Sequence, residues 1–349
     1  MTGWDLLVDR GDLQKTTLAP VDPDAPLAEG EALLEVESFA LTANNVTYGA
    51  VGDRIGYWKF FPAPEGQGRI PVWGYARVVR SNATDAPEGL RLFGYWPMSS
   101  HTVARLSKRP SGYVETSAHR AELPPTYNAY QEVAETSADD DWRSLLRPLF
   151  MTSFLIDDQL SDAQPRTLVL SSASSKTAMG LAWLAKARGT KVIGLTSPAH
   201  VALLNGLGLY DEVVAYDDVA GLKADAPAAY VDFAGRGEVT KGVHAALGDA
   251  LATSLGVGIT HWEAMAPPPQ VVGPQPVFFF APDRIRQRMK DWGPAELDAR
   301  FAAALRGFIA GNGWLKLKQH AGAEALQAIY GDVVAGRVSP DEGHIVRPR

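Results

Sequence analysis

The order of apolar and polar segments over Thr167–Ser197 predicts a strand, a tight turn, a helix and a second strand. The apolar run Leu168–Leu170 leads into the small residues Ser171–Ser175, a helical pattern follows as far as a stop at Gly189, and the apolar run Val192–Leu195 comes next. These elements fit in about thirty residues, the size of one right-handed βαβ unit. The turn of such a unit directs backbone N–H groups and the positive end of a helix dipole at one point, where a phosphate can bind.

The pattern of apolar residues and turn residues differs between the N-terminal part of the chain and the rest. As far as Tyr113 the segments are short, β-branched or aromatic and interrupted by Gly and Pro, as in Ala32–Leu41, Tyr75–Asn82 and Leu90–Trp96. Such segments are typical of strands in an antiparallel or barrel-like unit. After Phe150 strand-like and helical patterns alternate, which is typical of a doubly wound parallel sheet.

Six parallel strands are predicted in this second part, with helices between them. The strands are Leu168–Leu170, Val192–Leu195, Glu212–Tyr216, Ala229–Phe233, Leu251–Val257 and Val277–Phe280; the helices include Ala178–Arg188 and His200–Gly206, and the tail carries a helix over Ala323–Ala335 and a short strand near His344–Val346. The fold class is therefore α/β. We predict a barrel-like β-rich domain over residues 1–148 and 314–349 and a Rossmann dinucleotide-binding domain over residues 149–313.

Composition limits the classes of partner and chemistry. The 349 residues are 46% hydrophobic and 21% charged, as in an ordinary soluble globular protein, and the net charge of −7 argues against a nucleic-acid or membrane partner. The chain has no cysteine, which excludes a disulfide, a thiolate nucleophile and Cys-ligated zinc. The N-terminus is acidic and lacks a long apolar core, unlike a signal peptide, and no stretch has the roughly twenty apolar residues of a membrane span. We expect a cytoplasmic protein.

Several motifs resemble those of one enzyme superfamily. They are Asn44 and Gly52 with their spacing, GLAWLAKARGTKVIGLTS (180–197), NGLGLYDEVVAYDD (205–218), VDFAG (231–235) and GRVSPDEGHIV (336–346). Together they resemble the medium-chain dehydrogenase/reductase superfamily, in its zinc-free quinone oxidoreductase-like and enoyl reductase-like branches, and within these a branch of unknown function. The resemblance implies a GroES-like catalytic domain, a Rossmann domain, a small-molecule substrate and a homodimer.

The phosphate-binding turn departs from the family pattern. Where the family has a glycine-rich turn, this chain has ASSKTA (173–178), and each added Cβ keeps the backbone farther from a pyrophosphate. The side chains of Ser174, Ser175, Lys176 and Thr177 are donors that could replace that backbone contact. The same residues also fit a hydroxyl-rich helix N-cap with a solvated lysine.

The end of the second predicted strand favours NADP(H) over NAD. Thr196 and Ser197 stand where an acidic residue would bind the ribose of NAD and repel a 2′-phosphate. His200 is a further donor, although no arginine follows the strand, and the segment also fits an exposed N-cap. The resemblance adds Tyr216 on the adenosine side and Gly235 beside the ribose. Two further candidates, Gly258 and His261, follow the fifth strand at the same edge, where His261 could instead cap a helix or lie in the core.

The catalytic candidates lie in the segment NNVTYGAVGDRIGYW (44–58), where the resemblance implies that Asn44 and Gly52 belong to a loop leading toward the nicotinamide. Without zinc, a reductase of this kind needs a proton donor and a group that stabilises an oxyanion. Asn44, Tyr48 and Tyr57 are the candidates, because a phenol is neutral at pH 7 and can donate a proton. Either tyrosine taken alone also fits a half-buried packing residue.

Two functions remain open from the sequence. The first is a zinc-independent NADP(H)-dependent reductase of a hydrophobic enone, enoyl or carbonyl substrate, with no metal. The second is a dehydrogenase-like scaffold without hydride chemistry, either a ligand-binding protein or a cofactor-independent lyase or isomerase. The missing glycines favour the second function, and the residues at the strand ends favour the first.

Overall fold

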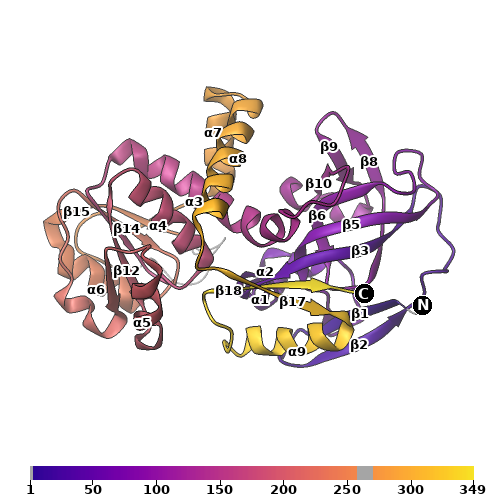
Figure 1. Ribbon diagram of the computed structural model, residues 1–349, viewed down its shortest axis with the longest axis horizontal. Helices are drawn as coiled ribbons and strands as arrows, with labels where there is room; N and C mark the ends of the chain where they lie inside the picture. Colours follow the sequence, from indigo (N-terminus) through magenta and orange to yellow (C-terminus); the bar gives the residue numbers. More distant parts are fainter. Residues whose placement is uncertain (1–2, 258–269) are drawn as a thin grey trace. The chain divides into compact units, whose positions relative to one another are not determined.

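The computed structural model describes residues 3–257 and 270–349, which form two compact units (Figure 1). The first, here called the β unit, extends to Leu145 and includes Leu315–Arg349. The second, here called the parallel-sheet unit, comprises Leu146–Trp314. Two of the predicted cofactor residues, Gly258 and His261, lie outside the described residues.

The described part of the β unit contains a large sheet and a small one. The large sheet has the order β17-β18-β3-β5-β6-β10-β9-β8, with β7 also paired to β3, and the small one has the order β2-β1-β4. Neighbours are antiparallel except β17 and β18, which are parallel. The strands are β1 Gly3–Asp9, β2 Thr16–Val21, β3 Ala32–Leu41, β4 Gln67–Gly68, β5 Pro71–Ser81, β6 Arg91–Pro97, β7 His101–Ala104, β8 Leu106–Arg109, β9 Gly112–Glu115, β10 Ala129–Glu132, β17 Lys316–Ala321 and β18 Glu342–Arg347.

Helices fill the connections of this unit. They are α1 Ala43–Ala50, α2 Gly52–Ile55 and α9 Gly322–Val334, with short 3₁₀ turns at Tyr57–Lys59, Ala118–Arg120 and Pro125–Tyr127. The segment that carries Asn44 was expected to be a loop, and it is helical instead. Asn45 caps the start of α1, because its Oδ1 accepts from the Thr42 N–H over 2.8 Å.

Close contact between β3 and β5 explains one glycine of the large sheet. A Cβ on Gly74 would lie 2.1 Å from the carbonyl oxygen of Ser38, so no other residue fits without moving a strand. The register shifts nearby, between Val36 and Ser38, as expected for a local irregularity of the ladder. The core beneath combines both sheets with α9, through side chains such as Leu34, Trp96 and Tyr330.

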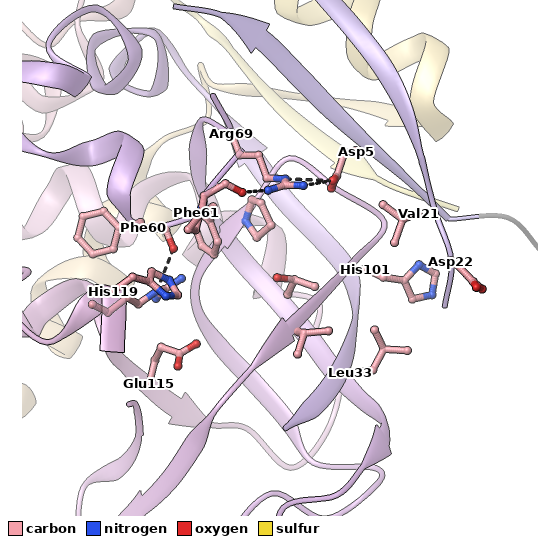
Figure 2. Close-up of a pocket in the computed structure, with 15 residues that line it drawn as sticks. Asp5, Val21, Asp22, Leu33, Phe60, Phe61, Arg69, His101, Glu115 and His119 are labelled. Atoms are coloured by element: carbon pink, nitrogen blue, oxygen red, sulfur yellow. Dashed lines mark hydrogen bonds and ion pairs between the residues drawn. The ribbon is translucent and has the colours of Figure 1, made fainter. Parts of the chain in front are cut away.

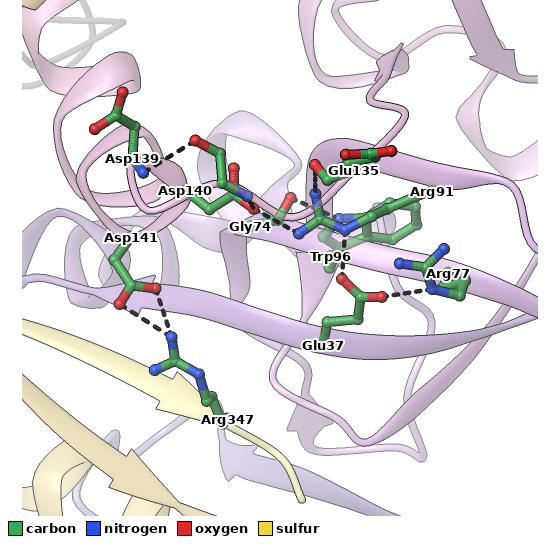
Figure 3. Close-up of polar contacts among 11 residues, drawn as sticks. Glu37, Gly74, Arg77, Arg91, Trp96, Glu135, Asp139, Asp140, Asp141 and Arg347 are labelled. Atoms are coloured by element: carbon green, nitrogen blue, oxygen red, sulfur yellow. Dashed lines mark hydrogen bonds and ion pairs between the residues drawn. The ribbon is translucent and has the colours of Figure 1, made fainter.

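A buried ionic network attaches the start of α3 (Asp140–Ala163) to the large sheet (Figure 3). Arg91 on β6 is 3% exposed, and its guanidinium donates to Glu37 over 2.6 Å, to Asp140 over 2.7 Å and to the carbonyl of Glu135 over 3.0 Å. Glu37 in turn accepts from Arg77 over 2.7 Å. The network joins β3, β5 and β6 to the first turn of α3.

The parallel-sheet unit contains the predicted doubly wound sheet. Its strand order is β13-β12-β11-β14-β15-β16 and every pair is parallel, so the predicted α/β fold class is confirmed. The strands are β11 Thr167–Leu170, β12 Lys191–Thr196, β13 Glu212–Ala215, β14 Ala228–Asp232, β15 Leu251–Gly256 and β16 Val277–Phe278, and the helices are α4 Lys176–Ala187, α5 Pro198–Leu207, α6 Gly237–Leu247, α7 Ala281–Asp291 and α8 Pro294–Gly311, with 3₁₀ turns at Tyr216–Gly221 and Gly248–Ala250.

Alternate residues of each strand belong to opposite faces of this sheet. Leu168 and Leu170 pack with α3 and α4, whereas Val169 packs with α6 on the other face. The chain therefore crosses from one face to the other between the neighbouring strands β11 and β14. Ligands of open parallel sheets bind outside the carboxyl ends of the strands at such a switch point.

Two helices that the sequence pattern did not predict follow the last parallel strand. β16 ends at Phe278 instead of Phe280, which is the N-cap residue of α7. α7 and α8 form a helical hairpin (Figure 1). Each has a proline in its first turn, which is a sequence signal for the start of a helix.

Candidate functional site

Most of the predicted cofactor residues lie at the carboxyl edge of the parallel sheet. The serine-rich turn follows β11, Ser197 follows β12, Tyr216 follows β13 and Gly235 lies in the loop after β14. Because parallel strands end at the same edge, residues from four separate segments come to one side of the sheet.

The turn after β11 is held in place by its own backbone and by two tyrosines. Ser172 has a φ of 49°, a left-handed conformation that is strained for a residue with a Cβ. Its N–H donates to the hydroxyl of Tyr216 over 2.8 Å, and the N–H of Ala173 donates to the carbonyl of Leu195 over 3.0 Å. The hydroxyl of Tyr210 donates to the carbonyl of Ala173 over 2.6 Å. The turn therefore keeps a tight conformation without glycine.

The four side chains predicted to bind phosphate surround the N-terminus of α4. Ser175 is the N-cap residue, and its Oγ accepts from the N–H of Ala178 over 3.2 Å. Ser174, Ser175, Lys176 and Thr177 are all half-buried, so each has part of its surface at the protein exterior. The first N–H groups of a helix have no acceptor within the helix, and its dipole is positive at this end. This arrangement can hold an anion.

A hydrogen-bond network that the sequence analysis missed joins the ends of β11 and β14. Ser171 Oγ donates to Asp232 Oδ1 over 2.6 Å and accepts from the N–H of Phe233 over 2.8 Å. Gly235 N–H also donates to Asp232 Oδ1, over 3.1 Å, and the Thr240 hydroxyl donates to Oδ2 over 3.0 Å. The network fixes the loop that carries Gly235 at the switch point. No local signal was available, because Ser171 and Asp232 are 61 positions apart in the chain.

The end of β12 offers fewer accessible groups than predicted. Thr196 is 1% exposed, so its side chain has almost no surface for a ligand. Ser197 and His200 are half-buried and adjacent, with 3.4 Å between Oγ and Nδ1. Contact with a ligand at this strand end therefore depends on Ser197 and His200.

An arginine from another loop supplies the positive charge that the end of β12 lacks. Arg236, in the loop before α6, is exposed, and its guanidinium carbon lies 5.2 Å from the centroid of the Tyr216 ring. The two residues are twenty positions apart, so no local pattern connects them. Tyr216 thus contacts the serine-rich turn through its hydroxyl and the exposed guanidinium of Arg236 through its ring.

The catalytic candidates of the β unit belong to an aromatic group, here called the tyrosine cluster, of Tyr48, Tyr57, Tyr95 and Tyr127. The rings of Tyr48 and Tyr57 have centroids 4.5 Å apart, and the hydroxyl oxygens of Tyr57 and Tyr127 are 3.0 Å apart. Asn44, one helical turn before Tyr48, donates through Nδ2 to the Tyr48 hydroxyl over 2.8 Å. The structure therefore brings together all three predicted residues and adds Tyr127, from a short 3₁₀ turn that has no motif.

Burial keeps these hydroxyls protonated. Tyr48 and Tyr57 are 7% and 8% exposed, and burial raises the pKa of Tyr57 to about 12 and that of Tyr48 further. Burial also raises the pKa of Tyr127. Neutral phenols at these positions can donate hydrogen bonds or protons, and a buried tyrosinate is disfavoured.

Within residues 3–257 and 270–349, no group of three or more His, Cys, Asp or Glu side chains is placed to hold a metal ion. None of the helices in these ranges is long and apolar enough to cross a membrane.

Comparisons with known proteins agree with this architecture. The model of a family described as "Protein of unknown function (DUF2855)" matches residues 39–339. No curated protein shows a significant match. Among solved structures, CurA from Vibrio vulnificus in complex with NADPH is 15% identical, with a TM-score of 0.63 over 99% of each chain. The Etr1p/NADP/crotonyl-CoA complex is 15% identical, with a TM-score of 0.58 over 99% of this chain and 100% of that one.

A third solved structure is the mitochondrial 2-enoyl thioester reductase Etr1p/Etr2p heterodimer from Candida tropicalis. It is 14% identical, with a TM-score of 0.58, and the match covers 99% of this chain and 100% of that one. Because the sequence identities are only 14–15%, the structural similarity establishes a shared fold alone. The fold is the one predicted from the resemblance to medium-chain dehydrogenases/reductases.

Proposed function

We propose that this chain, which belongs to the family of proteins of unknown function described as DUF2855, is a zinc-independent NADP(H)-dependent reductase. Its substrate is a hydrophobic small molecule with a C=C bond polarised by a carbonyl, or with a carbonyl itself. The observation that carries the proposal is the carboxyl edge of the parallel sheet, where hydroxyl donors, a helix N-terminus and an arginine come together at the switch point.

The residues at this edge are suited to a dinucleotide phosphate. The N-terminus of α4, with Ser174, Lys176 and Thr177, would hold the pyrophosphate. Ser175 uses its oxygen as the helix cap but keeps its hydroxyl hydrogen for a further bond. The left-handed φ of Ser172 supports the fit, because the tight turn is retained although the glycines are absent.

The adenosine side of the same edge is suited to a 2′-phosphate. The Tyr216 ring, Ser197 and His200 are half-buried, and Arg236 adds an exposed guanidinium against Tyr216. Arginine binds phosphate oxygens through two parallel N–H donors, and no carboxylate follows β12 to repel them. Solved neighbours whose descriptions include NADPH or NADP support this choice of cofactor.

The tyrosine cluster supplies the proton. The chemistry that NADPH would supply when bound is hydride transfer, after which the substrate atom that becomes negative would need a proton or a hydrogen bond. Tyr57 would donate it and regain a proton from Tyr127, whose hydroxyl oxygen lies 3.0 Å away, and water would in turn supply a proton to Tyr127. Tyr48 accepts from Asn44 over 2.8 Å and donates toward Tyr127, so it positions the Tyr127 hydroxyl. Burial holds every donor in its neutral form.

The alternative function, a scaffold without hydride chemistry, is favoured by one feature of the turn. The N–H groups of Ser172 and Ala173 both donate within the protein, to Tyr216 and Leu195. In a glycine-rich turn such groups approach the pyrophosphate directly. If the turn excludes the pyrophosphate, the site binds another ligand or a partner.

The edge strand of the sheet supports a homodimer. Within the described part of the chain β16 pairs on one side only, with β15, and Val277 on it is 59% exposed. An apolar edge strand is a natural surface for pairing with a second copy. Sedimentation equilibrium would show a dimer, and a charged substitution such as Val277→Lys should shift the protein toward the monomer.

A turnover assay distinguishes reductase from scaffold. The purified protein is mixed with NADPH and with each of a set of enoyl thioesters, α,β-unsaturated ketones and quinones, and loss of the near-ultraviolet absorbance of NADPH is followed. Oxidation that depends on both protein and substrate supports the reductase. Tight NADPH binding with no oxidation by any member of the set would favour the scaffold.

A further inference from the structure

The β unit contains a cavity that the proposed reaction does not use (Figure 2). Its volume is about 270 Å³, and it is lined in part by Leu33, Phe60, Phe61, Val103, Glu115 and Arg120. All of its lining residues come from the β unit. None of the four members of the tyrosine cluster lines it.

A buried guanidinium faces this cavity without a carboxylate partner. Arg120 is 2% exposed; its Nε donates to the carbonyl of Phe60 and one terminal nitrogen donates to the hydroxyl of Tyr130, each over 3.0 Å. The Phe61 ring lies against it, with 4.5 Å from the guanidinium carbon to the ring centroid. Across the described ranges, no carboxylate oxygen lies within 4.0 Å of the Arg120 nitrogens. Buried charges are normally paired, because burial removes their hydration.

A buried carboxylate faces the same cavity from β9. Glu115 is 5% exposed, and its Oε1 accepts from the N–H groups of Ser117, over 2.8 Å, and Arg105, over 3.2 Å. It also forms no ion pair with any cation that the structure describes. Two buried charges of opposite sign therefore line one cavity without contacting each other.

The other ionisable groups around the cavity are paired, neutral or exposed. Asp5 is bound by Arg69, whose terminal nitrogen lies 2.6 Å from Oδ2, and also accepts from the Ser99 hydroxyl. Burial lowers the pKa of His101, which favours its neutral form. Asp22 and His119 are exposed to water. Arg120 and Glu115 are thus the two buried charges that a ligand would meet.

We propose that this cavity binds an α-amino acid with an apolar side chain. Its carboxylate pairs with Arg120 and its ammonium group pairs with Glu115, which gives each buried charge a partner of opposite sign. The side chain packs against the apolar wall formed by Leu33, Phe60 and Phe61. A molecule with only one of the two charges leaves the other protein charge unpaired and binds more weakly.

Calorimetric titration with three probes tests this assignment. The probes are L-leucine, 4-methylpentanoate, which lacks the ammonium group, and 3-methylbutylamine, which lacks the carboxylate. L-leucine should bind with a Kd below about 1 mM and each single-charge analogue about tenfold more weakly, as expected for the loss of one charge-assisted hydrogen bond. Equal affinity for L-leucine and 4-methylpentanoate, or no saturable binding of L-leucine, would overturn the proposal.

Two variants assign the charges to their residues. Glu115→Gln keeps an oxygen for the backbone N–H groups; it should weaken L-leucine binding about tenfold and strengthen 4-methylpentanoate binding, because a repulsive carboxylate is removed. Arg120→Gln should weaken L-leucine and 4-methylpentanoate but not 3-methylbutylamine. If either variant left the affinity for L-leucine unchanged, the corresponding assignment would be wrong.

A third variant covers the case in which Arg120→Gln does not fold. Val103→Trp introduces a large ring from a wall position that is 48% exposed, and it should abolish L-leucine binding without removing a buried charge. Arg109→Gln, an exposed arginine on β8 outside the cavity, is the matched control and should bind like the unmodified protein. Retained L-leucine binding in Val103→Trp would contradict the location of the site.

Discussion

At the scale of single side chains, the proposed proton transfer predicts how substitutions of Tyr57 and Tyr127 change kcat. Replacing either with Phe keeps the ring packing and removes one hydroxyl of the pair that is 3.0 Å apart. If Tyr57 donates the proton, Tyr57→Phe should lower kcat by about 10²- to 10⁴-fold. Tyr127→Phe should lower it less, because water can replace a relay. Steady-state kinetics on a substrate identified in the turnover assay measures both effects.

Tyr113 on β9 provides the control for these variants. It is 3% exposed and also belongs to the β unit, but it lies outside the tyrosine cluster. Tyr113→Phe should leave kcat unchanged, and all three variants should retain the affinity for NADPH. Full activity in Tyr57→Phe would mean that the tyrosines are packing residues and that the proton comes from another group.

Arg236 makes a second prediction at this scale, about the choice of cofactor. NADPH differs from NADH only in its 2′-phosphate, so removal of a cation that binds this group should affect one cofactor alone. Arg236→Gln should weaken NADPH binding about tenfold and leave NADH binding nearly unchanged, as expected for one charge-assisted hydrogen bond. Fluorescence titration of both cofactors measures the two affinities.

Lys241 on α6 is the control for the change in net charge. It pairs with Glu238 over 3.7 Å, and its side chain is 51% exposed. Lys241→Gln should leave the affinities for both cofactors unchanged. Equal losses of NADPH and NADH affinity in Arg236→Gln would mean that the arginine acts on the shared part of the cofactor or on the loop.

At the scale of elements, the ionic network at the start of α3 predicts how two substitutions change the free energy of unfolding. Asp140→Ala leaves the buried guanidinium of Arg91 without its partner at the helix start, and should lower the free energy of unfolding by about 3–5 kcal/mol. Arg77→Gln removes a half-exposed partner of the same network and should cost about 1 kcal/mol or less. Denaturant unfolding of each variant gives the two values, and similar losses would contradict the difference in burial.

Elements with a strong local pattern were predicted well, and those fixed by distant contacts were not. The apolar runs of β11 and β12 reveal two neighbouring strands because a buried parallel strand must be apolar throughout. The resemblance implied a loop where α1 lies, and this was wrong: Asn45 caps the start of a helix. β16 is only two residues long, so the run Val277–Phe280 gave no sign of where the strand ends and α7 begins.

At the scale of the whole molecule, the sequence predicted the fold but only part of the candidate site. The pattern of the chain indicated one β-rich and one alternating region, and the six predicted parallel strands lie in one sheet. The pairs Arg236–Tyr216 and Tyr57–Tyr127 form only when separate loops meet, and no spacing along the chain encodes them. The serine network around Asp232 was hidden for the same reason.

The central claim is that the carboxyl edge of the parallel sheet binds NADPH, and equilibrium titration of the unmodified protein with NADPH and NADH tests it most directly. We expect NADPH to bind more tightly than NADH by about tenfold or more, because Arg236, Ser197 and His200 are donors for its 2′-phosphate and no acidic residue follows β12. Equal affinity for the two cofactors would contradict the assigned 2′-phosphate contacts. No binding of either cofactor at millimolar concentration would contradict the reductase and leave the scaffold function.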